Sequence, residues 1–307
     1  MTAATSPATP GLPRSPANPA PPTQGEHPPR SGSIILVGGY GQVGQEVAGV
    51  LAPRYPGRVV LAGRTLATAR AAAATIGHGT RAAQLDADNL HQADALLSDA
   101  ALVLACAGHT RPALAEASFR AGAHYADVTA DSTLIAGIEA LDPLARRHGA
   151  TAVLSVGLAP GLTNLLAAAA AAGLDSVHRV DLLVRLGIGD THGPAALGWT
   201  LDALNGEFDV PEPSGSRRVR PFTERRRFLL PDALPAAAPG YRPGRHRPVV
   251  GHLFDFPEQR TLPRTLGVPA AVSWLALDPP LVGTALAVAA DQASPGCSLT
   301  PAPDAWP

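Results

Sequence analysis

The sequence contains no lysine, and all 24 of its basic residues are arginine. A chain without lysine cannot form a Schiff base with a carbonyl compound or with pyridoxal phosphate, and it cannot supply the lysine of a P-loop. It also lacks the lysine of the Tyr-x-x-x-Lys pair that short-chain reductases use. We therefore exclude these mechanisms and expect any proton transfer to depend on histidine, tyrosine, aspartate or water.

Cysteine, net charge and long apolar runs are also scarce. The two cysteines, Cys106 and Cys297, are far apart and predict neither a disulfide scaffold nor a zinc site, which favours a cytoplasmic location. The net charge of −1 gives no reason to expect nucleic acid or an anionic membrane as a partner. No apolar run approaches the ~18 residues that cross a bilayer. The ten histidines show no ligand spacing, so we expect no metal site.

Composition divides the chain into four parts. Residues 1–32 hold nine prolines and few large apolar side chains, which predicts a disordered extension. Strand and helix signals alternate over residues 33–157, which predicts a dinucleotide-binding domain. A looser pattern over residues 158–293 predicts a smaller substrate domain, and residues 294–307 predict a disordered tail. The expected fold class is α/β, a doubly wound parallel Rossmann sheet with a second, smaller α+β domain.

The alternating part predicts a parallel sheet with crossover helices. Six strands in about 125 residues is the number expected for a doubly wound sheet, whose ligand cleft lies where the first and fourth strands end. We expect strands over 34–37, 59–62, 81–85, 101–107, 124–128 and 152–156, and helices over 43–52, 66–76, 91–98, 111–121 and 133–148. The second domain predicts strands over 177–186, 225–230 and 249–256 and a helix over 195–204.

A glycine-rich turn follows the first strand. Gly39, Gly41 and Gly44 have the G-x-G-x-x-G spacing of dinucleotide-binding proteins. The first allows a tight turn, the second lets the backbone approach a pyrophosphate, and the third lets the next helix pack closely. The start of that helix favours phosphate charge. We expect the cofactor to contact the whole turn, namely Gly38, Gly39, Tyr40, Gly41, Gln42, Val43 and Gly44.

The residues after the second and third strands indicate which dinucleotide binds. An enzyme that uses NAD usually has an acidic residue after the second strand, whereas this chain has Arg64 and Thr65, which favours the 2′-phosphate of NADP. The alternative is that Arg64 is only a solvated loop residue. Thr65 is also expected to cap the helix over 66–76. Asp86 lies where it could approach the adenine, or it is a turn aspartate.

Two groups of residues near the ends of the fourth and fifth strands are candidates for the reaction site. Cys106, Ala107 and Gly108 are small and suit a backbone that passes under the ribose or nicotinamide, with Cys106 expected to pack rather than react. Imidazole, phenol and carboxylate are the groups that a proton-coupled hydride transfer needs. The candidate catalytic residues are therefore His124, Tyr125 and Asp127, although a strand-end aspartate is often only a turn residue.

A second glycine-containing turn, SVGLAPGLTNL, covers residues 155–165. Its amides and the helix that follows could hold a substrate carboxylate through Pro160, Gly161 and Asn164. The alternative is a helix capped by Thr163 or Asn164 at a domain boundary. A run of arginines over 217–227 is interpreted as a solvated strand and loop, which could also contribute to binding an anionic substrate.

Several motifs together resemble the saccharopine dehydrogenase family, in particular its saccharopine reductase-like branch. They are GGYGQVG over 38–44, LAGRT over 61–65, ACAG over 105–108, HYADVTAD over 124–131, VGLAPGLTN over 156–164, GDTHGPAALGWTLD over 189–202 and FPEQRTLPRTLGVP over 256–269. The resemblance implies NAD(P)-dependent hydride transfer at a carbon–nitrogen bond, between an amino-acid-derived imine and a secondary amine. It also implies a homodimer whose α+β domain helps to form the substrate site.

The resemblance further implies that residues 189–199, which include His192 and Trp199, lie near a small-molecule substrate, and that Arg264 is available to pair with its carboxylate. We therefore expect an NADP-dependent oxidoreductase, with NAD as the less favoured cofactor. Two alternatives stay open. One is a Rossmann protein that binds NADP without turnover, as a sensor or partner-binding module. The other is a carbonyl or enoyl reductase of the same fold.

Overall fold

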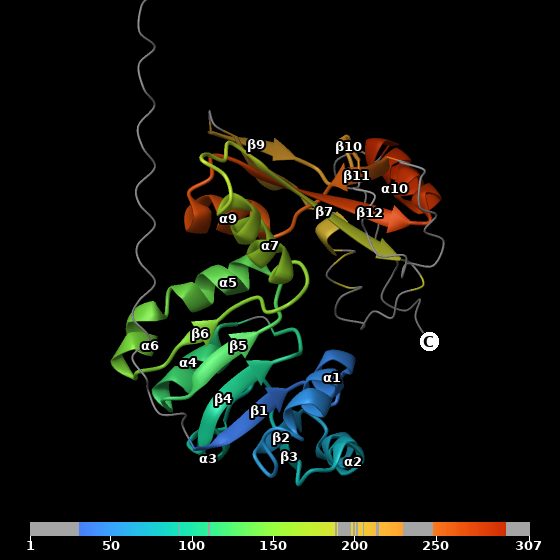
Figure 1. Ribbon diagram of the computed structural model, residues 1–307. Helices are drawn as coiled ribbons and strands as arrows, with labels where there is room; N and C mark the ends of the chain where they lie inside the picture. The colour runs from blue at the N-terminus through green and yellow to red at the C-terminus, as the bar shows by residue number, and fades with distance from the viewer. Residues whose placement is uncertain are drawn as a thin grey trace, which may run out of the picture.

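The structure is a computed structural model that describes residues 31–91, 93–109, 111–187, 189, 198, 200, 202–204, 206–212, 215–229 and 248–292. Nearly all of the expected disordered extension, the expected tail, and both His192 and Trp199 lie outside the described residues, as does most of the helix expected over 195–204. The chain forms two layered units, with α7 and α9 at their junction (Figure 1).

Six parallel strands form the central sheet of the first domain, in the order β3-β2-β1-β4-β5-β6. The strands are β1 (Ser33–Val37), β2 (Val59–Gly63), β3 (Arg81–Gln84), β4 (Ala100–Ala105), β5 (His124–Asp127) and β6 (Ala152–Val153). This order confirms the expected doubly wound α/β fold. Because the strand order reverses between β1 and β4, a crevice for a ligand is expected at their carboxyl ends.

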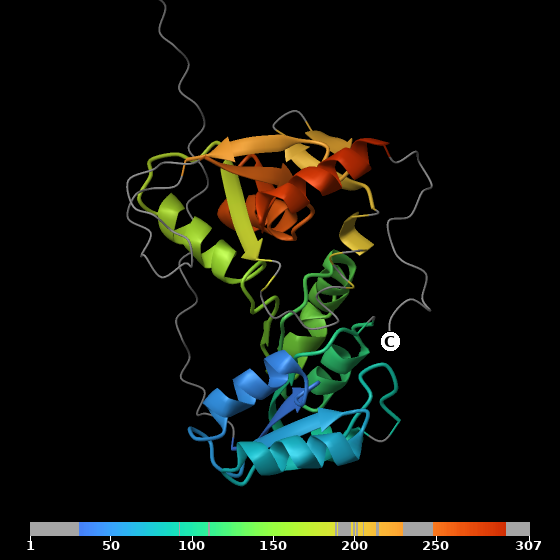
Figure 2. The same cartoon turned by 90° about the vertical axis from the view of Figure 1, so that its right-hand side faces the viewer.

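Helices cover both faces of this sheet, as Figure 2 shows for α1 and α2. One face, which includes Ile34, Leu36 and Leu61, packs against α1 (Gln42–Leu51) and α2 (Leu66–Ile76). The other face packs against four helices. They are α3 (Asp94–Leu97), α4 (Ala113–Arg120), α5 (Ser132–Glu139) and α6 (Asp142–Arg147). The sheet is therefore buried on both sides, as its continuous apolar strands require.

Two expected elements differ from the structure. The single helix expected over 133–148 is divided into α5 and α6, because Pro143 in the first turn of α6 has no amide hydrogen to continue a helix. The sixth strand is shorter than expected because the chain turns at Ser155, whose φ is 62°. The Ser155 amide donates to Asp127 Oδ1 (2.8 Å) instead of extending the strand.

The second domain is built on a mixed sheet in the order β10-β11-β12-β7. Its strands are β7 (Val180–Gly187), β10 (Arg225–Phe228), β11 (Val249–Leu253) and β12 (Ala271–Asp278). One face packs against the hairpin of β8 (Phe208–Glu212) and β9 (Gly215–Val219). The other face packs against α9 (Glu258–Leu266) and α10 (Pro280–Gln292), and α7 (Leu162–Ala171) lies beside α9. This confirms a second α+β unit, while the boundary expected at residue 157 stays a prediction.

Candidate functional site

The glycine-rich turn leaves no room for side chains at two of its positions. A Cβ on Gly44 would lie 2.4 Å from the Gly38 carbonyl oxygen and 2.6 Å from Gly39 Cα. A Cβ on Gly38, whose φ is +76°, would lie 2.5 Å from the Ala107 methyl. These contacts hold the start of α1 against the end of β1 and bring the turn beside the residues that follow β4.

The start of α1 fits the pyrophosphate of a dinucleotide. Its N-cap is Gly41, no side chain caps the helix, and its first turn contains no acidic residue. The positive end of the helix dipole therefore meets no competing protein anion there. Together with the close backbone packing of the turn, this gives residues 38–44 the form of a phosphate cradle.

Tyr40 joins this turn to the end of β2. A Cβ on Gly63 would lie 2.4 Å from Tyr40 Cε1, so the ring rests directly on the strand end. The Thr65 amide donates to the Tyr40 hydroxyl (3.2 Å), and Gln45 Nε2 donates to the Tyr40 carbonyl (2.9 Å). Thr65 is at the N-cap of α2 as expected, but its side chain makes no capping hydrogen bond.

Arg64 and Asp86 both lie at the carboxyl edge of the sheet. The Arg64 side chain is exposed, and its carbonyl oxygen accepts a hydrogen bond from Gln84 Nε2 (3.0 Å). Its guanidinium is in no ion pair with the part of the chain that the structure describes. The Asp86 carboxylate accepts from the Asp88 amide (3.1 Å), which is the contact of a turn aspartate. Their roles toward a cofactor stay predictions.

Cys106 lies in the crevice between β1 and β4. Its amide donates to the Val37 carbonyl (2.8 Å), which extends the pairing of the two strands. Burial raises the pKa of the Cys106 thiol to about 11. The thiol is therefore protonated at neutral pH, as a packing role requires. A Cβ on Gly108 would meet open space, so the crevice floor ends at this residue.

A chain of three buried polar side chains lies at the carboxyl ends of β4 and β5. His109 Nε2 is 3.2 Å from the Tyr125 hydroxyl, and His109 Nδ1 is 3.3 Å from the Ala107 carbonyl oxygen. Asp127 lies beyond Tyr125 and is 1% exposed. Burial, followed by the neighbouring Asp127 carboxylate, raises the pKa of Tyr125 well above its usual value.

The two Asp127 oxygens have different surroundings. Oδ1 accepts from the Ser155 amide (2.8 Å) and from the Thr129 amide (3.2 Å). Oδ2 is buried without a hydrogen-bond partner among the described residues. Burial raises the pKa of Asp127, and the two amides and the nearby His109 oppose that rise. A carboxyl group in this setting is suited to carrying a proton.

The structure does not bring His124 to this group. His124 is the first residue of β5, at the opposite end of the strand from Asp127, and successive side chains of a strand point to opposite faces. Its Nδ1 accepts a hydrogen bond from the Thr151 amide (3.1 Å). His109, which the sequence reasoning did not select, takes the position of the imidazole beside Tyr125.

The second glycine-containing turn is tightly folded. Gly161 has φ +129°, and a Cβ there would lie 2.3 Å from the Gly157 carbonyl oxygen. Asn164 Oδ1 accepts from the Gly161 amide (3.0 Å), so Asn164 is the capping residue. Asn164 Nδ2 donates to Thr261 Oγ1 (3.1 Å), which joins this turn to α9. Pro160 directly precedes Gly161, and substrate binding by this turn stays a prediction.

Buried polar contacts connect the same turn to α9. The Thr163 hydroxyl donates to Glu258 Oε1 (2.5 Å), and Glu258 is fully buried. The Glu258 Oε2 atom has no hydrogen-bond partner among the described residues. Burial raises the pKa of Glu258, and the hydrogen bond from Thr163 opposes the rise.

The arginines of the second domain are largely paired with acids. Arg264 donates from both terminal nitrogens to Glu139 of α5, at 2.7 and 2.6 Å. In the basic run, Arg217 pairs with Glu212 and Glu224, Arg218 with Glu207 and Asp209, and Arg226 with Asp181. These pairs agree with a solvated, internally neutralised surface rather than a free basic patch.

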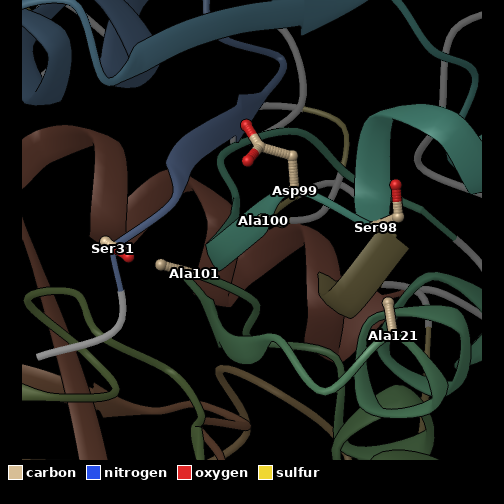
Figure 3. Close-up of a pocket in the computed structure, with 6 residues that line it drawn as sticks. All are labelled: Ser31, Ser98, Asp99, Ala100, Ala101 and Ala121. Atoms are coloured by element: carbon tan, nitrogen blue, oxygen red, sulfur yellow. The ribbon is translucent and has the colours of Figure 1, made fainter. Parts of the chain in front are cut away.

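A cavity of about 270 Å³ lies at the opposite edge of the first sheet (Figure 3). It is lined by Ser31, Ser98, Asp99, Ala100, Ala101 and Ala121. Residues 100 and 101 begin β4, so this cavity is separated from the glycine-rich turn by the length of the strands. Among the residues that the structure describes, none of the helices has the length and apolarity to cross a membrane, and no cluster of potential metal ligands occurs.

The sheet order, the phosphate cradle and the crevice between β1 and β4 define a dinucleotide-binding Rossmann domain. Residues 34–153 match the family described as "Saccharopine dehydrogenase NADP binding domain". The first domain of the chain therefore belongs to the saccharopine dehydrogenase NADP-binding family, and its cofactor is NADP. This confirms the resemblance noted in the sequence.

Solved structures share the fold at low sequence identity. Apo saccharopine dehydrogenase (L-Glu forming) from Saccharomyces cerevisiae has a TM-score of 0.57 and 20% identity, over 80% of this chain and 54% of that chain. The chain thus spans about half the length of that enzyme. UDP-N-acetylglucosamine 3-dehydrogenase GnnA from Acidithiobacillus ferrooxidans has a TM-score of 0.42 and 14% identity, over 80% and 69% of the two chains. Biliverdin reductase from Synechocystis has a TM-score of 0.38 and 16% identity, over 81% and 72%. None of the curated proteins compared with the chain matches it.

Proposed function

We propose that the protein is an NADP-dependent oxidoreductase that transfers hydride at the carbon–nitrogen bond of an amino-acid-derived imine or secondary amine. The observation that carries the proposal is the buried pair of Tyr125 and Asp127 at the end of β5, beside the crevice of an NADP-binding domain. The reaction at a carbon–nitrogen bond is supported by the motifs VGLAPGLTN and FPEQRTLPRTLGVP. It is further supported by the fold shared with the yeast protein named saccharopine dehydrogenase.

In this proposal the residues at the carboxyl edge divide the cofactor among them. The turn over 38–44 would hold the pyrophosphate, and Arg64 with the Thr65 hydroxyl would bind the 2′-phosphate. Asp86 would lie beside the adenine, and residues 106–108 would lie under the nicotinamide ribose. NADP supplies hydride chemistry when bound, while Asp127 and Tyr125 would exchange a proton with the substrate nitrogen.

The substrate would lie between this edge and the second glycine-containing turn. Pro160, Gly161 and the start of α7 would face its carboxylate. Arg264 would assist only if a substrate carboxylate competes with Glu139, because that acid occupies both of its terminal nitrogens. His192 and Trp199 remain expected near the substrate, although both lie outside the described residues.

The experiment that tests the proposal follows NADPH oxidation with mixtures of amino acids and 2-oxo acids. We expect turnover with the wild-type protein and its loss in Asp127→Asn, with NADPH binding retained in both. NADPH binding without turnover across the panel would contradict the proposal and favour a sensor. Turnover only with carbonyl or enoyl compounds would instead favour a reductase of the other class.

The proposal includes a homodimer. It is supported by the outer surface of α7, where Leu162, Leu165 and Leu166 are 48%, 69% and 60% exposed. Leucines exposed together on one helix are typical of an interface. Light scattering on the wild-type protein and on Leu165→Glu tests this, with a dimer expected for the former and a monomer for the latter. A monomeric wild-type protein would contradict it.

A further inference from the structure

The hydrogen bonds around His109 assign its ring protons. Nδ1 faces the Ala107 carbonyl, which only accepts, so Nδ1 carries the hydrogen. In the neutral ring Nε2 then has no hydrogen and accepts from the Tyr125 hydroxyl. The single hydroxyl proton of Tyr125 is therefore directed to His109, and Asp127 Oδ2 is left without a donor.

One additional proton changes this arrangement. When Nε2 is protonated it donates to the Tyr125 oxygen, and the hydroxyl proton is released to turn toward Asp127 Oδ2. The buried carboxylate oxygen then gains the donor that it lacks in the neutral arrangement, which removes the cost of an unpaired buried acceptor. The three side chains thus have two hydrogen-bonding states that differ by one proton.

We propose that His109, Tyr125 and Asp127 form a buried proton store in which His109 holds the proton consumed when the imine nitrogen becomes an amine. This inference rests on the proposed function. His109 is a positioning residue, because it acts on the substrate through the other two side chains. The store would release its proton from Asp127 Oδ2, the atom of the chain that is free to take a further partner.

The step is balanced in atoms and electrons. NADPH gives a hydride to the imine carbon, and the electron pair of the C=N bond moves to the nitrogen. The nitrogen takes a proton from Asp127 Oδ2, which receives the Tyr125 hydroxyl proton, and the Tyr125 oxygen receives the proton from His109 Nε2. The products are the amine, NADP⁺ and a neutral imidazole, which is recharged by one proton from solvent.

The groups that control this store are few. His109 and Tyr125 are the titratable side chains that act on Asp127, and the remaining contacts are the Ser155 and Thr129 amides. Cys106, which also follows β4, keeps its proton because burial raises its pKa to about 11. Removal of the imidazole is therefore the direct way to change the charge that Asp127 faces.

The test compares His109→Gln with the wild-type protein and with His148→Gln, in which an exposed histidine at the end of α6 is replaced. Aspartate labelled with ¹³C at the carboxyl carbon reports the titration of Asp127 by NMR in the cofactor-free protein, with the signal assigned by Asp127→Asn. We expect the Asp127 pKa to rise in His109→Gln, because the charge that lowers it is absent. We expect no change in His148→Gln.

Turnover provides the second readout. The rate of imine reduction by the wild-type protein should fall as pH rises and the store loses its proton, and His109→Gln should lack this limb and lower kcat roughly 10- to 100-fold. An Asp127 titration that is equal in His109→Gln and wild type overturns the proposal, as does an unchanged pH profile. A shifted titration in a protein without turnover would refute the proposed function while supporting the coupling of the three groups.

Discussion

Arg264 of α9 donates from both terminal nitrogens to the Glu139 carboxylate of α5, at 2.7 and 2.6 Å. The pair connects the second domain to the first, and Arg260 adds a contact to Ser132 at the start of the same helix. The side chains of Arg264 and Glu139 are 55% and 36% exposed. The ion pair is therefore expected to contribute little stability, because water and salt screen exposed charges.

A double-mutant cycle over Arg264→Ala and Glu139→Ala tests this pair. We expect a coupling free energy below about 1 kcal/mol in urea unfolding, decreasing with salt. Initial rates separate the tie from the substrate role implied by the resemblance. That role requires a higher KM in Arg264→Ala but not in Glu139→Ala, which frees the guanidinium. An equal KM in the two variants would limit Arg264 to connecting the domains.

Arg64 is expected to determine the choice of cofactor. A charged hydrogen bond to the 2′-phosphate contributes about 1.5–3 kcal/mol, so Arg64→Ala should weaken NADPH binding roughly 10- to 100-fold. NADH has no 2′-phosphate, and its affinity should not change. Isothermal titration calorimetry measures both. Arg54→Ala is the matched control, because Arg54 is exposed in the turn after α1 and precedes β2. Tighter binding of NADH than NADPH by the wild type would contradict this assignment.

Gly44 and Gly49 lie on the same helix and predict opposite results on replacement by alanine. A Cβ on Gly44 would overlap the Gly38 carbonyl oxygen, so Gly44→Ala should lower the free energy of unfolding by about 1–3 kcal/mol and weaken NADPH binding. A Cβ on Gly49 would meet nothing within 4 Å. Gly49→Ala should therefore raise the free energy of unfolding by up to about 1 kcal/mol. Equal stability of both variants would show that α1 is not held against the turn.

The buried Glu258 predicts how stability depends on pH. Its folded pKa lies above the ordinary value of 4.5, so its protonated form is favoured by folding. The corresponding stability is fully present below the unfolded pKa and is lost as pH rises through the folded pKa. Glu258→Gln keeps an acceptor for Thr163 and does not titrate. Urea unfolding should therefore give a higher free energy for Glu258→Gln than for wild type above this window, with the difference decreasing toward acid pH.

Cys106 is expected to react slowly with alkylating reagents. With a pKa of about 11, roughly one thiol in a thousand is ionised at about pH 8. Iodoacetamide should therefore modify Cys106 about 100-fold more slowly than a cysteine with the ordinary pKa of 9.0. Mass spectrometry of the Cys297→Ser variant measures this rate at one site. Rapid modification would show that the thiol is activated, and Cys106→Ser should retain NADPH binding in either case.

The order of the first sheet could be predicted because its signals are local. The strand before Gly39, the glycine spacing and the following helix are consecutive, and crossover rules then fix where the strands lie. The break between α5 and α6 was also encoded locally, by Pro143, although the apolar pattern continues on both sides of it. Local pattern alone was therefore insufficient where a missing amide opposed it.

The candidate site was less predictable because its contacts cross the sheet. His109 is a single histidine after a glycine, and it becomes part of the site only because β4 and β5 are neighbours, which brings it to Tyr125 sixteen residues later. His124 has the more suggestive sequence position, but the alternation of side chains and the direction of the strand take it away from Asp127. A position after β4, at the cleft edge, was the available signal for His109.

The second sheet shows the same limit. β12 has the apolar sequence AVSWLALD, which agrees with a buried strand but does not specify its neighbours. It becomes central through parallel pairing with β7, from Ala271 opposite Val180 to Asp278 opposite Gly187, and through antiparallel pairing with β11. Such long-range pairing depends on how the whole domain packs.

The contact between Tyr40 and Gly63 constrains how this sequence can evolve. The ring lies where any side chain at position 63 would have to be, 2.4 Å from its Cβ. A larger residue at position 63 therefore requires a smaller one at position 40, and the two positions should covary among relatives. The turn that binds phosphate thus also restricts the residue with which the second strand ends. An exchange of cofactor preference that adds an acidic side chain at position 63 would have to replace Tyr40 in the same step.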